Sequence, residues 1–212
     1  MPIGVTPEQS QLSEAVGKFA SRYAPVDKTR ADFDPLAAGE RPPWWDELVA
    51  HGFHAVHLPE DVGGQGGGLV DLACVIEAAA TALLPGPLLA TVTAGAVALL
   101  ADPNATCEAL LTDLAQGATA AVILPQRSEF VATADGADWR LSGVSEPTLG
   151  ACSARSLIVA ARCHDGEVRW FVVDTNAATV AVDAQRGTDL TTDVGILRLD
   201  GHPVRAQLTG ID

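Results

Sequence analysis

The glycine cluster 63–68 is the first segment whose composition could serve chemistry. Bare backbone N–H groups in such a loop can approach a phosphate group closely, as they do in nucleotide-binding proteins. The cluster departs from both nucleotide-binding patterns, because Leu69 stands where G-x-G-x-x-G needs its last glycine and no G-K-[ST] follows. We therefore expect a tight turn that leads into the next helix.

Three histidines follow one another at three-residue steps, at His51, His54 and His57. On a continuous helix their imidazoles could face one metal ion. Gly52 and Pro59 argue against a continuous helix, and in an extended segment a three-residue step alternates between faces. The sequence contains no H-E-x-x-H motif, and it places His164 and His202 in turns. It predicts no metal site.

A nucleophile and a general base are the next chemistry to consider. Ser145 departs from G-x-S-x-G, because Pro147 replaces the final glycine. Glu77 lies at the edge of an apolar helical stripe. A buried carboxylate there could be a base with a perturbed pKa, but an exposed or ion-paired glutamate is the commoner case. The residues alone predict no hydrolase and assign no catalytic residue.

Composition limits the classes of partner. The chain has 212 residues, 48% of them hydrophobic, enough for a core without disulfides or metals. A formal net charge of −14 argues against binding to nucleic acid and to anionic membranes. The apolar segment Leu88–Ala101 has 14 residues, fewer than the roughly 18 to 20 that cross a bilayer, so we expect a core helix.

Cysteine usage and the first residues suggest a compartment. The four cysteines form no C-x-x-C pair, which favours reduced structural thiols. The segment MPIGVTPEQS has neither a basic nor an apolar stretch of the kind that directs secretion. We expect a cytoplasmic protein.

Helical signals fill the first half of the chain. Thr6-Pro7-Glu8-Gln9 combines a capping residue, a proline at the first helical position and a glutamine three residues after the cap. Further helices are expected near 44–50, 69–83, 88–101 and 107–114, and Gly117 can close the last one in a left-handed conformation. Asp32 to Arg41 is expected to be a loop, because Pro35 and Gly39 interrupt it.

From Thr119 onward, short β-branched runs replace the helical periodicity. Seven strands are expected, at 120–124, 130–133, 139–141, 157–161, 168–173, 179–182 and 195–199. Turns are expected at Asp135-Gly136, Asp165-Gly166 and Asp200-Gly201. The predicted class is α+β, with an all-α domain over 1–117 followed by a small β-barrel or sandwich-like domain over 118–212.

The order of motifs from Leu58 to Val92 resembles the acyl-CoA dehydrogenase family. In that family a tryptophan-containing helix leads through a glycine turn to Pro-Glu, Gly-Gly-x-Gly, a glutamate-bearing helix and Pro-Gly-Pro-Leu. The residues that carry the resemblance are Trp44, Trp45, Leu48, Gly52, Phe53, Leu58, Pro59, Glu60, Gly63, Gly64, Gly66, Asp71, Glu77, Pro85, Gly86, Pro87 and Leu88. Trp139–Gly143 and Phe171–Asp174 extend the likeness to the family's middle β-domain.

The resemblance implies an activity and a cofactor. Family members remove an α-hydrogen and a β-hydride from an acyl-CoA thioester, with FAD as hydride acceptor and a glutamate as base. It also implies a homo- or hetero-oligomer of similar subunits, and in some heteromeric members a bulky, steroid-derived thioester. The family's flavin segments align with Leu124 and Gln126, and with Pro147 and Thr148, which become the implied cofactor-binding residues.

Two departures from the family pattern leave alternatives open. The flavin loop is shortened to Pro125–Glu129, and Ser145–Leu149 replaces the family's Lys-x-Trp-Ile-Thr segment. The family's carboxy-terminal helical domain, which carries the base, would begin near 209–212. The chain is therefore expected to be inactive alone, either as a fragment of a dehydrogenase or as a reduced member that needs a partner. The alternatives are a non-catalytic structural subunit of a heteromeric dehydrogenase and an unrelated two-domain binding protein.

Overall fold

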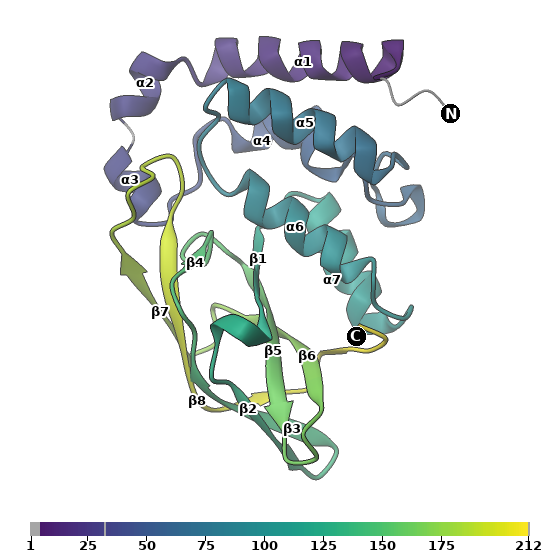
Figure 1. Ribbon diagram of the computed structural model, residues 1–212, viewed down its shortest axis with the longest axis vertical. Coiled ribbons are helices and arrows are strands. Elements are labelled where there is room, and N and C mark those ends of the chain that lie inside the picture. The colour runs from purple at the N-terminus through teal and green to yellow at the C-terminus, as the bar shows by residue number, and fades with distance from the viewer. Residues whose placement is uncertain (1–4, 32, 212) are drawn as a thin grey trace.

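The computed structural model describes residues 5–31 and 33–211. Figure 1 shows the helices gathered at one end and the strands at the other, with the carboxy-terminal end of the chain beside the helices. This arrangement confirms the predicted α+β class, helices first and strands second. Residues 1–4, 32 and 212, which include both outer ends of the predicted domains 1–117 and 118–212, lie outside the description, and that division stays a prediction.

Helix α1 (Pro7–Tyr23) begins as its sequence predicts. The hydroxyl of Thr6 accepts from the backbone N–H of Gln9, and the Gln9 side chain accepts from the Thr6 N–H. Its buried face, Val16, Phe19 and Ala20, packs on α5 (Leu69–Thr81). The other helices are α2 (Val26–Ala31), α4 (Trp45–Ala50), α6 (Leu88–Ala98), α7 (Ala105–Ala115) and the short 3₁₀ turns η1 (Phe53–Ala55), η2 (Glu60–Val62) and η3 (Pro125–Arg127).

The prediction of a loop over Asp32 to Arg41 was wrong for residues 33–37. Phe33–Ala37 forms the short helix α3, while Asp32 itself is outside the described residues. Pro35 lies within the first helical turn, where its missing N–H costs no hydrogen bond, so it does not break the helix. Gly39 then ends the helix with a φ of +87°.

One nine-stranded mixed sheet forms the rest of the fold, with the strand order β4-β8-β3-β2-β5-β6-β9, while β1 pairs with β5 and β7 with β8. The strands are β1 (Ala120–Ile123), β2 (Val131–Asp135), β3 (Asp138–Val144), β4 (Thr148–Leu149), β5 (Ser156–Cys163), β6 (Val168–Asp174), β7 (Val180–Gln185), β8 (Val194–Val204) and β9 (Gln207–Leu208). The β1–β5 and β2–β5 pairs are parallel and the others are antiparallel. All seven predicted strands are present, whereas β4 and β9 are too short to leave a periodic signal.

The predicted turn at Asp200-Gly201 was wrong, because β8 runs through it. The pairing of β3 with β8 shifts register between Leu141 and Gly143, so one extra residue of β8 forms an irregularity inside the strand. His202 is consequently a buried strand residue, 5% exposed, and not a turn residue. Its Nδ1 lies 2.7 Å from the Thr179 hydroxyl.

A shared core joins the helices to the sheet. One cluster of buried side chains contains Ala94 of α6 and Leu110 of α7 together with Ile158 of β5 and Trp170 of β6. The indole Nε1–H of Trp45 donates to the carbonyl of Gly117 at 2.8 Å, at the point where helices give way to strands. Within the described residues, no helix is both long and apolar enough to cross a membrane.

Candidate functional site

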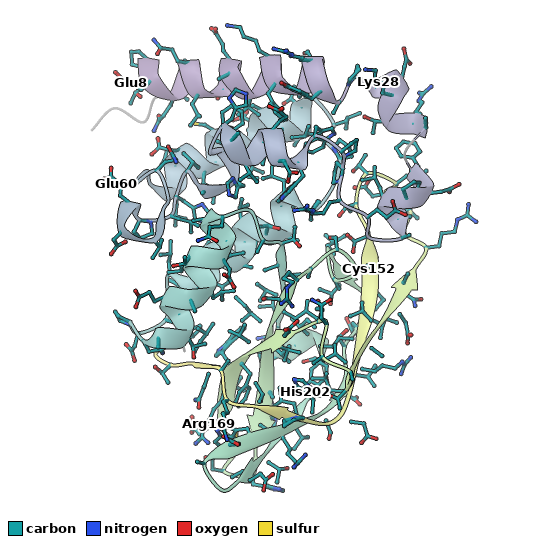
Figure 2. The ribbon with its side chains drawn as sticks, turned by 180° about the vertical axis from the view of Figure 1, so that it is seen from behind. Glu8, Lys28, Glu60, Cys152, Arg169 and His202 are labelled. Atoms are coloured by element: carbon teal, nitrogen blue, oxygen red, sulfur yellow. The ribbon has the colours of Figure 1, made fainter. Side chains whose placement is uncertain are left out.

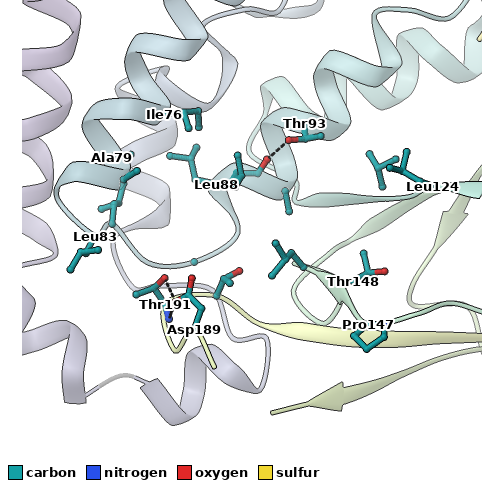
Figure 3. Close-up of a pocket in the computed structure, with 18 residues that line it drawn as sticks. Ile76, Ala79, Leu83, Leu88, Thr93, Leu124, Pro147, Thr148, Asp189 and Thr191 are labelled. Carbon is teal, nitrogen blue, oxygen red and sulfur yellow. Dashed lines mark hydrogen bonds between the residues drawn. The ribbon is translucent and has the colours of Figure 1, made fainter. Parts of the chain in front are cut away.

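A groove of about 660 Å³ opens between the helices and the sheet. Figure 3 shows its walls, which come from the end of α5, the start of α6, β1, β4 and the loop before β8. The lining residues are Ile76, Ala79, Ala80, Leu83, Leu84, Gly86, Leu88, Leu89, Ala90, Thr93, Val122, Leu124, Pro147, Thr148, Leu149, Asp189, Thr191 and Thr192. Apolar side chains predominate, so the groove suits an apolar ligand.

Helix α5 supplies one wall of the groove, because one of its faces packs in the helical core and the other faces the groove. Leu72 and Val75 are buried in the helical core beneath α1, whereas Ile76 and Ala79 line the groove. At the end of the helix, Gly86 adopts a φ of +98° between two prolines and turns the chain into α6. The Gly86 N–H donates to the carbonyl of Thr191 at 2.6 Å, which ties this corner to the loop before β8.

A second pair of contacts fixes the opposite wall. Gly150, directly after β4, has a φ of +72°, and a Cβ there would overlap the side chain of Ala90 on α6. The close approach of β4 to α6 therefore requires glycine. The Thr91 hydroxyl, on the buried side of α6, accepts from the N–H of Ala120 at 3.3 Å and so links α6 to β1.

The buried carboxylate of Asp193 holds the turn that follows β4. It is 2% exposed and accepts from the Cys152 N–H at 2.7 Å and from the Ser153 hydroxyl at 2.6 Å. The backbone carbonyl of Asp193 accepts from Gly150 at 2.9 Å. Burial, followed by the negative charge of Asp193, raises the pKa of the Cys152 thiol to about 12, so this cysteine stays protonated. Figure 2 shows Cys152 where the helical part meets the sheet.

The polar groups of the groove are committed to local hydrogen bonds. Thr93 donates to the carbonyl of Leu89 at 2.7 Å, and Thr148 donates to that of Glu146 at 3.1 Å. Among the described lining residues, Asp189 is the one with a carboxylate. Its Oδ1 accepts from both the N–H and the hydroxyl of Thr191. These groups shape the loop, and the groove offers its ligand mainly apolar surface.

The structure brings three of the four sequence-predicted cofactor residues together. Leu124, Pro147 and Thr148 line the groove, while Gln126 lies on η3 outside the lining. Sequence reasoning missed the loop 189–192, because no motif marks it. The α5 stripe through Ile76 and Leu83 was visible as a helical periodicity, but periodicity alone cannot separate a core face from a groove wall.

The other residues singled out in the sequence do not form sites. The N–H groups of Gly64, Gly66 and Gly67 donate to the chain's own carbonyls at 59, 58 and 56, which confirms the predicted tight turn. No group of three histidine, cysteine or acidic side chains within residues 5–31 and 33–211 could hold a metal ion. His51 instead stacks on Phe53 with ring centroids 5.3 Å apart. Glu77 does not line the groove.

The cysteines match their predicted role as unpaired thiols. Cys74, Cys107 and Cys163 are buried and Cys152 is half-buried, and all four are free. Burial raises the pKa of the Cys107 and Cys163 thiols, so they remain neutral packing groups near pH 7.

Comparison with known proteins agrees with this geometry. Residues 6–118 match the family described as acyl-CoA dehydrogenase, N-terminal domain. The chain is 31% identical over 207 residues to acyl-CoA dehydrogenase FadE34 of Mycobacterium tuberculosis, a match that covers 94% of this chain and 27% of the relative. The chain therefore spans about a quarter of that curated relative.

Solved structures share the fold over almost the whole chain. A structure titled Tcur3481-Tcur3483 steroid ACAD G363A variant aligns with a TM-score of 0.84 and 27% identity, covering 97% of this chain and 58% of that one. A glutaryl-CoA dehydrogenase of Mycobacterium smegmatis in complex with FADH2 aligns with a TM-score of 0.79 over 96% of this chain and 56% of that one. At 18% identity the latter shows the fold alone. With more than half of its residues matched by the family model, the chain belongs to the acyl-CoA dehydrogenase family.

Proposed function

We propose that this chain forms part of the substrate site of an FAD-dependent acyl-CoA dehydrogenase, with the groove between α5, α6 and the sheet receiving the acyl group of a thioester. The observation that carries the proposal is the groove itself, about 660 Å³ in volume and lined mainly by apolar side chains. Ligand pockets of roughly 300 to 1,000 Å³ hold molecules of drug size. A bulky acyl group, including a steroid-derived one, matches this volume.

The groove would bind the acyl group by burying apolar surface. Leu124, directly after β1, and Leu149, on β4, are 44% and 51% exposed. Each square ångström of apolar surface removed from water contributes about 25 cal/mol. The hydrogen bond at Gly86 and the close approach at Gly150 fix the positions of the groove walls in advance of binding, which limits the ordering that binding requires.

The described residues do not by themselves fit a complete flavin site. Pro125 has no N–H to offer, and the Thr148 hydroxyl already donates to Glu146. The side chains of Leu124 and Pro147 can supply only apolar contact. FAD, when bound, accepts the hydride in this family, and we propose that further residues or another subunit complete its binding while this chain contributes one wall.

A non-catalytic structural subunit of a heteromeric dehydrogenase is the second candidate. The groove lining favours it, because among the described lining residues only Asp189 carries a carboxylate, and its Oδ1 is engaged in holding the loop at Thr191. On this proposal the chain keeps the fold for assembly, and a similar subunit supplies the flavin and the base.

Titration of the chain with hexadecanoyl-CoA tests the proposed binding role. We expect saturable heat on titration, and a loss of about tenfold or more in affinity for Leu124→Asp, because a charge would replace an apolar wall. Leu100→Asp is the matched control, since Leu100 is 66% exposed and lies outside the groove lining. Equal affinity of the two variants would contradict binding in the groove.

Flavin content distinguishes the two candidates. The chain is mixed with a flavin-bearing similar subunit, and the FAD retained per complex is measured for the unmodified chain and for Pro147→Asp. Reduced FAD with Pro147→Asp supports a shared flavin site. Formation of the complex with unchanged FAD supports the structural subunit.

A further inference from the structure

Leu83 adopts a backbone conformation that L-amino acids avoid. Its φ is +51°. Every other residue with positive φ within residues 5–31 and 33–211 is a glycine. A left-handed conformation brings Cβ close to the carbonyl oxygen, which is why glycine, and less often asparagine, normally occupies it.

The strained position belongs to a defined helix ending. The Leu84 N–H donates to the Ala79 carbonyl at 2.9 Å, and the Leu83 N–H donates to the Ala80 carbonyl at 3.0 Å, the two bonds of a Schellman motif. This motif requires a left-handed residue after the helix cap. The position is therefore fixed by the hydrogen bonds that end α5, and the residue type alone is free to vary.

Within the described residues the same motif ends two other α-helices, with glycine each time. Gly39 after α3 and Gly117 after α7 have φ values of +87° and +93°. Each donates to the carbonyl three residues earlier, Leu36 and Leu114 respectively. Both of these helix ends have glycine at the left-handed position. Leu83 is therefore an exception among the helix ends of this chain that share the motif.

Burial of the Leu83 side chain does not offset the backbone strain at this position. Its side chain is 58% exposed, whereas the next residue, Leu84, packs against the helical core. Leu83 lines the groove, and Figure 3 shows it following Ile76 and Ala79 toward Asp189 and Thr191. A strained residue with an exposed apolar side chain beside a groove indicates a role in binding.

We infer that Leu83 is a specificity-determining residue whose side chain contacts the apolar part of the ligand in this groove. The inference rests on the proposed function, and it deepens it by assigning an apolar contact to the α5 corner. With the exposed Leu89 and Leu149, Leu83 gives the groove apolar edges that an acyl group would cover. On this inference, leucine at position 83 lowers the stability of the fold and adds an apolar contact with the ligand.

Three variants test this inference by measuring melting temperature and affinity for hexadecanoyl-CoA together. Leu83→Gly relieves the strain and removes the side chain, so we expect a melting temperature higher by about 2–4 °C and affinity lower by about fivefold. Leu83→Ala keeps the left-handed strain, and we expect the same loss of affinity without the gain in melting temperature. Leu100→Ala, at an exposed site outside the groove, controls for loss of a surface leucine and leaves the affinity unchanged.

The outcomes separate this inference from the proposed function. Unchanged affinity in Leu83→Gly and Leu83→Ala, with tight binding by the original chain, overturns the role of Leu83 alone. A melting temperature that falls in Leu83→Gly overturns the argument from strain. Absence of hexadecanoyl-CoA binding by the original chain overturns the proposed function, and the role of Leu83 with it.

Discussion

His54 and His57 are buried imidazoles that the fold keeps neutral. They are 2% and 5% exposed, and neither ring nitrogen of His57 has a hydrogen-bond partner within the described residues. His54 Nε2 lies 3.1 Å from the Ala115 carbonyl oxygen. Burial lowers the pKa of both side chains, and protonation of His54 would lower the pKa of His57 further by charge repulsion.

The free energy of unfolding should therefore fall in acid. Because the folded-state pKa of each imidazole lies below the ordinary value of 6.5, the unfolded chain binds more protons just below that pH. The stabilisation is complete above about pH 7 and is lost progressively as pH falls below 6.5 toward the folded-state pKa values. Urea unfolding between pH 5 and 8 measures the slope.

His57→Leu removes one of the titrating imidazoles and should flatten this slope in part, because His54 and His202, whose pKa values burial also lowers, remain. His164→Gln, at an exposed turn, is the matched control and should leave the slope unchanged. A slope that is the same in all three proteins would show that groups other than His57 set the acid sensitivity.

At the scale of elements, the pairing of β3 with β8 depends on Gly143. Its φ is +147°, and a Cβ there would overlap the carbonyl oxygen of Glu129 and crowd the backbone of Phe130. The residue lies where the register of the two strands shifts. Directly after β3, the Ser145 hydroxyl accepts from the Leu197 N–H at 2.9 Å and holds the end of this strand against β8.

We expect Gly143→Ala to lower the free energy of unfolding by roughly 3 kcal/mol, because backbone strain and steric overlap add. Gly136→Ala is the control: it also has positive φ, at +66°, but a Cβ there meets no atom within 4 Å. That change should cost about 1 kcal/mol. Equal losses in urea unfolding would show that conformation, and not contact with Glu129, decides the cost.

At the scale of the whole molecule, the shared cluster predicts one cooperative unit. Ile158 of β5 is fully buried beside side chains of α6 and α7. We expect Ile158→Ala to lower the free energy of unfolding by about 2–5 kcal/mol. Loss of helix, followed by circular dichroism, and exposure of tryptophan, followed by fluorescence, should shift together in urea.

Val131→Ala controls for trimming an aliphatic strand residue, since Val131 is 45% exposed, and should change stability by less than about 1 kcal/mol. Two separated transitions in Ile158→Ala would indicate that residues 1–117 and 118–212 fold independently. That outcome would support the predicted domain division over a single cooperative unit.

The sequence by itself determined the local features of this protein. The Thr6 cap, the buried stripe of α1 and the left-handed glycine at 117 follow from interactions within a few residues, so their patterns predicted them. The resemblance of ordered motifs indicated the family, and it located Leu124, Pro147 and Thr148, which meet at one groove.

Only the tertiary structure decided the features that depend on distant residues. The course of β8 through Asp200-Gly201 and the burial of His202 follow from pairing with β3, some 60 residues earlier in the chain. The groove exists because the Gly86 N–H bonds to Thr191 while α6 lies against Gly150. Patterns of sequence report local conformation and the polarity of a face, but the partner that a face meets, or the space left beside it, is set by packing across the whole molecule.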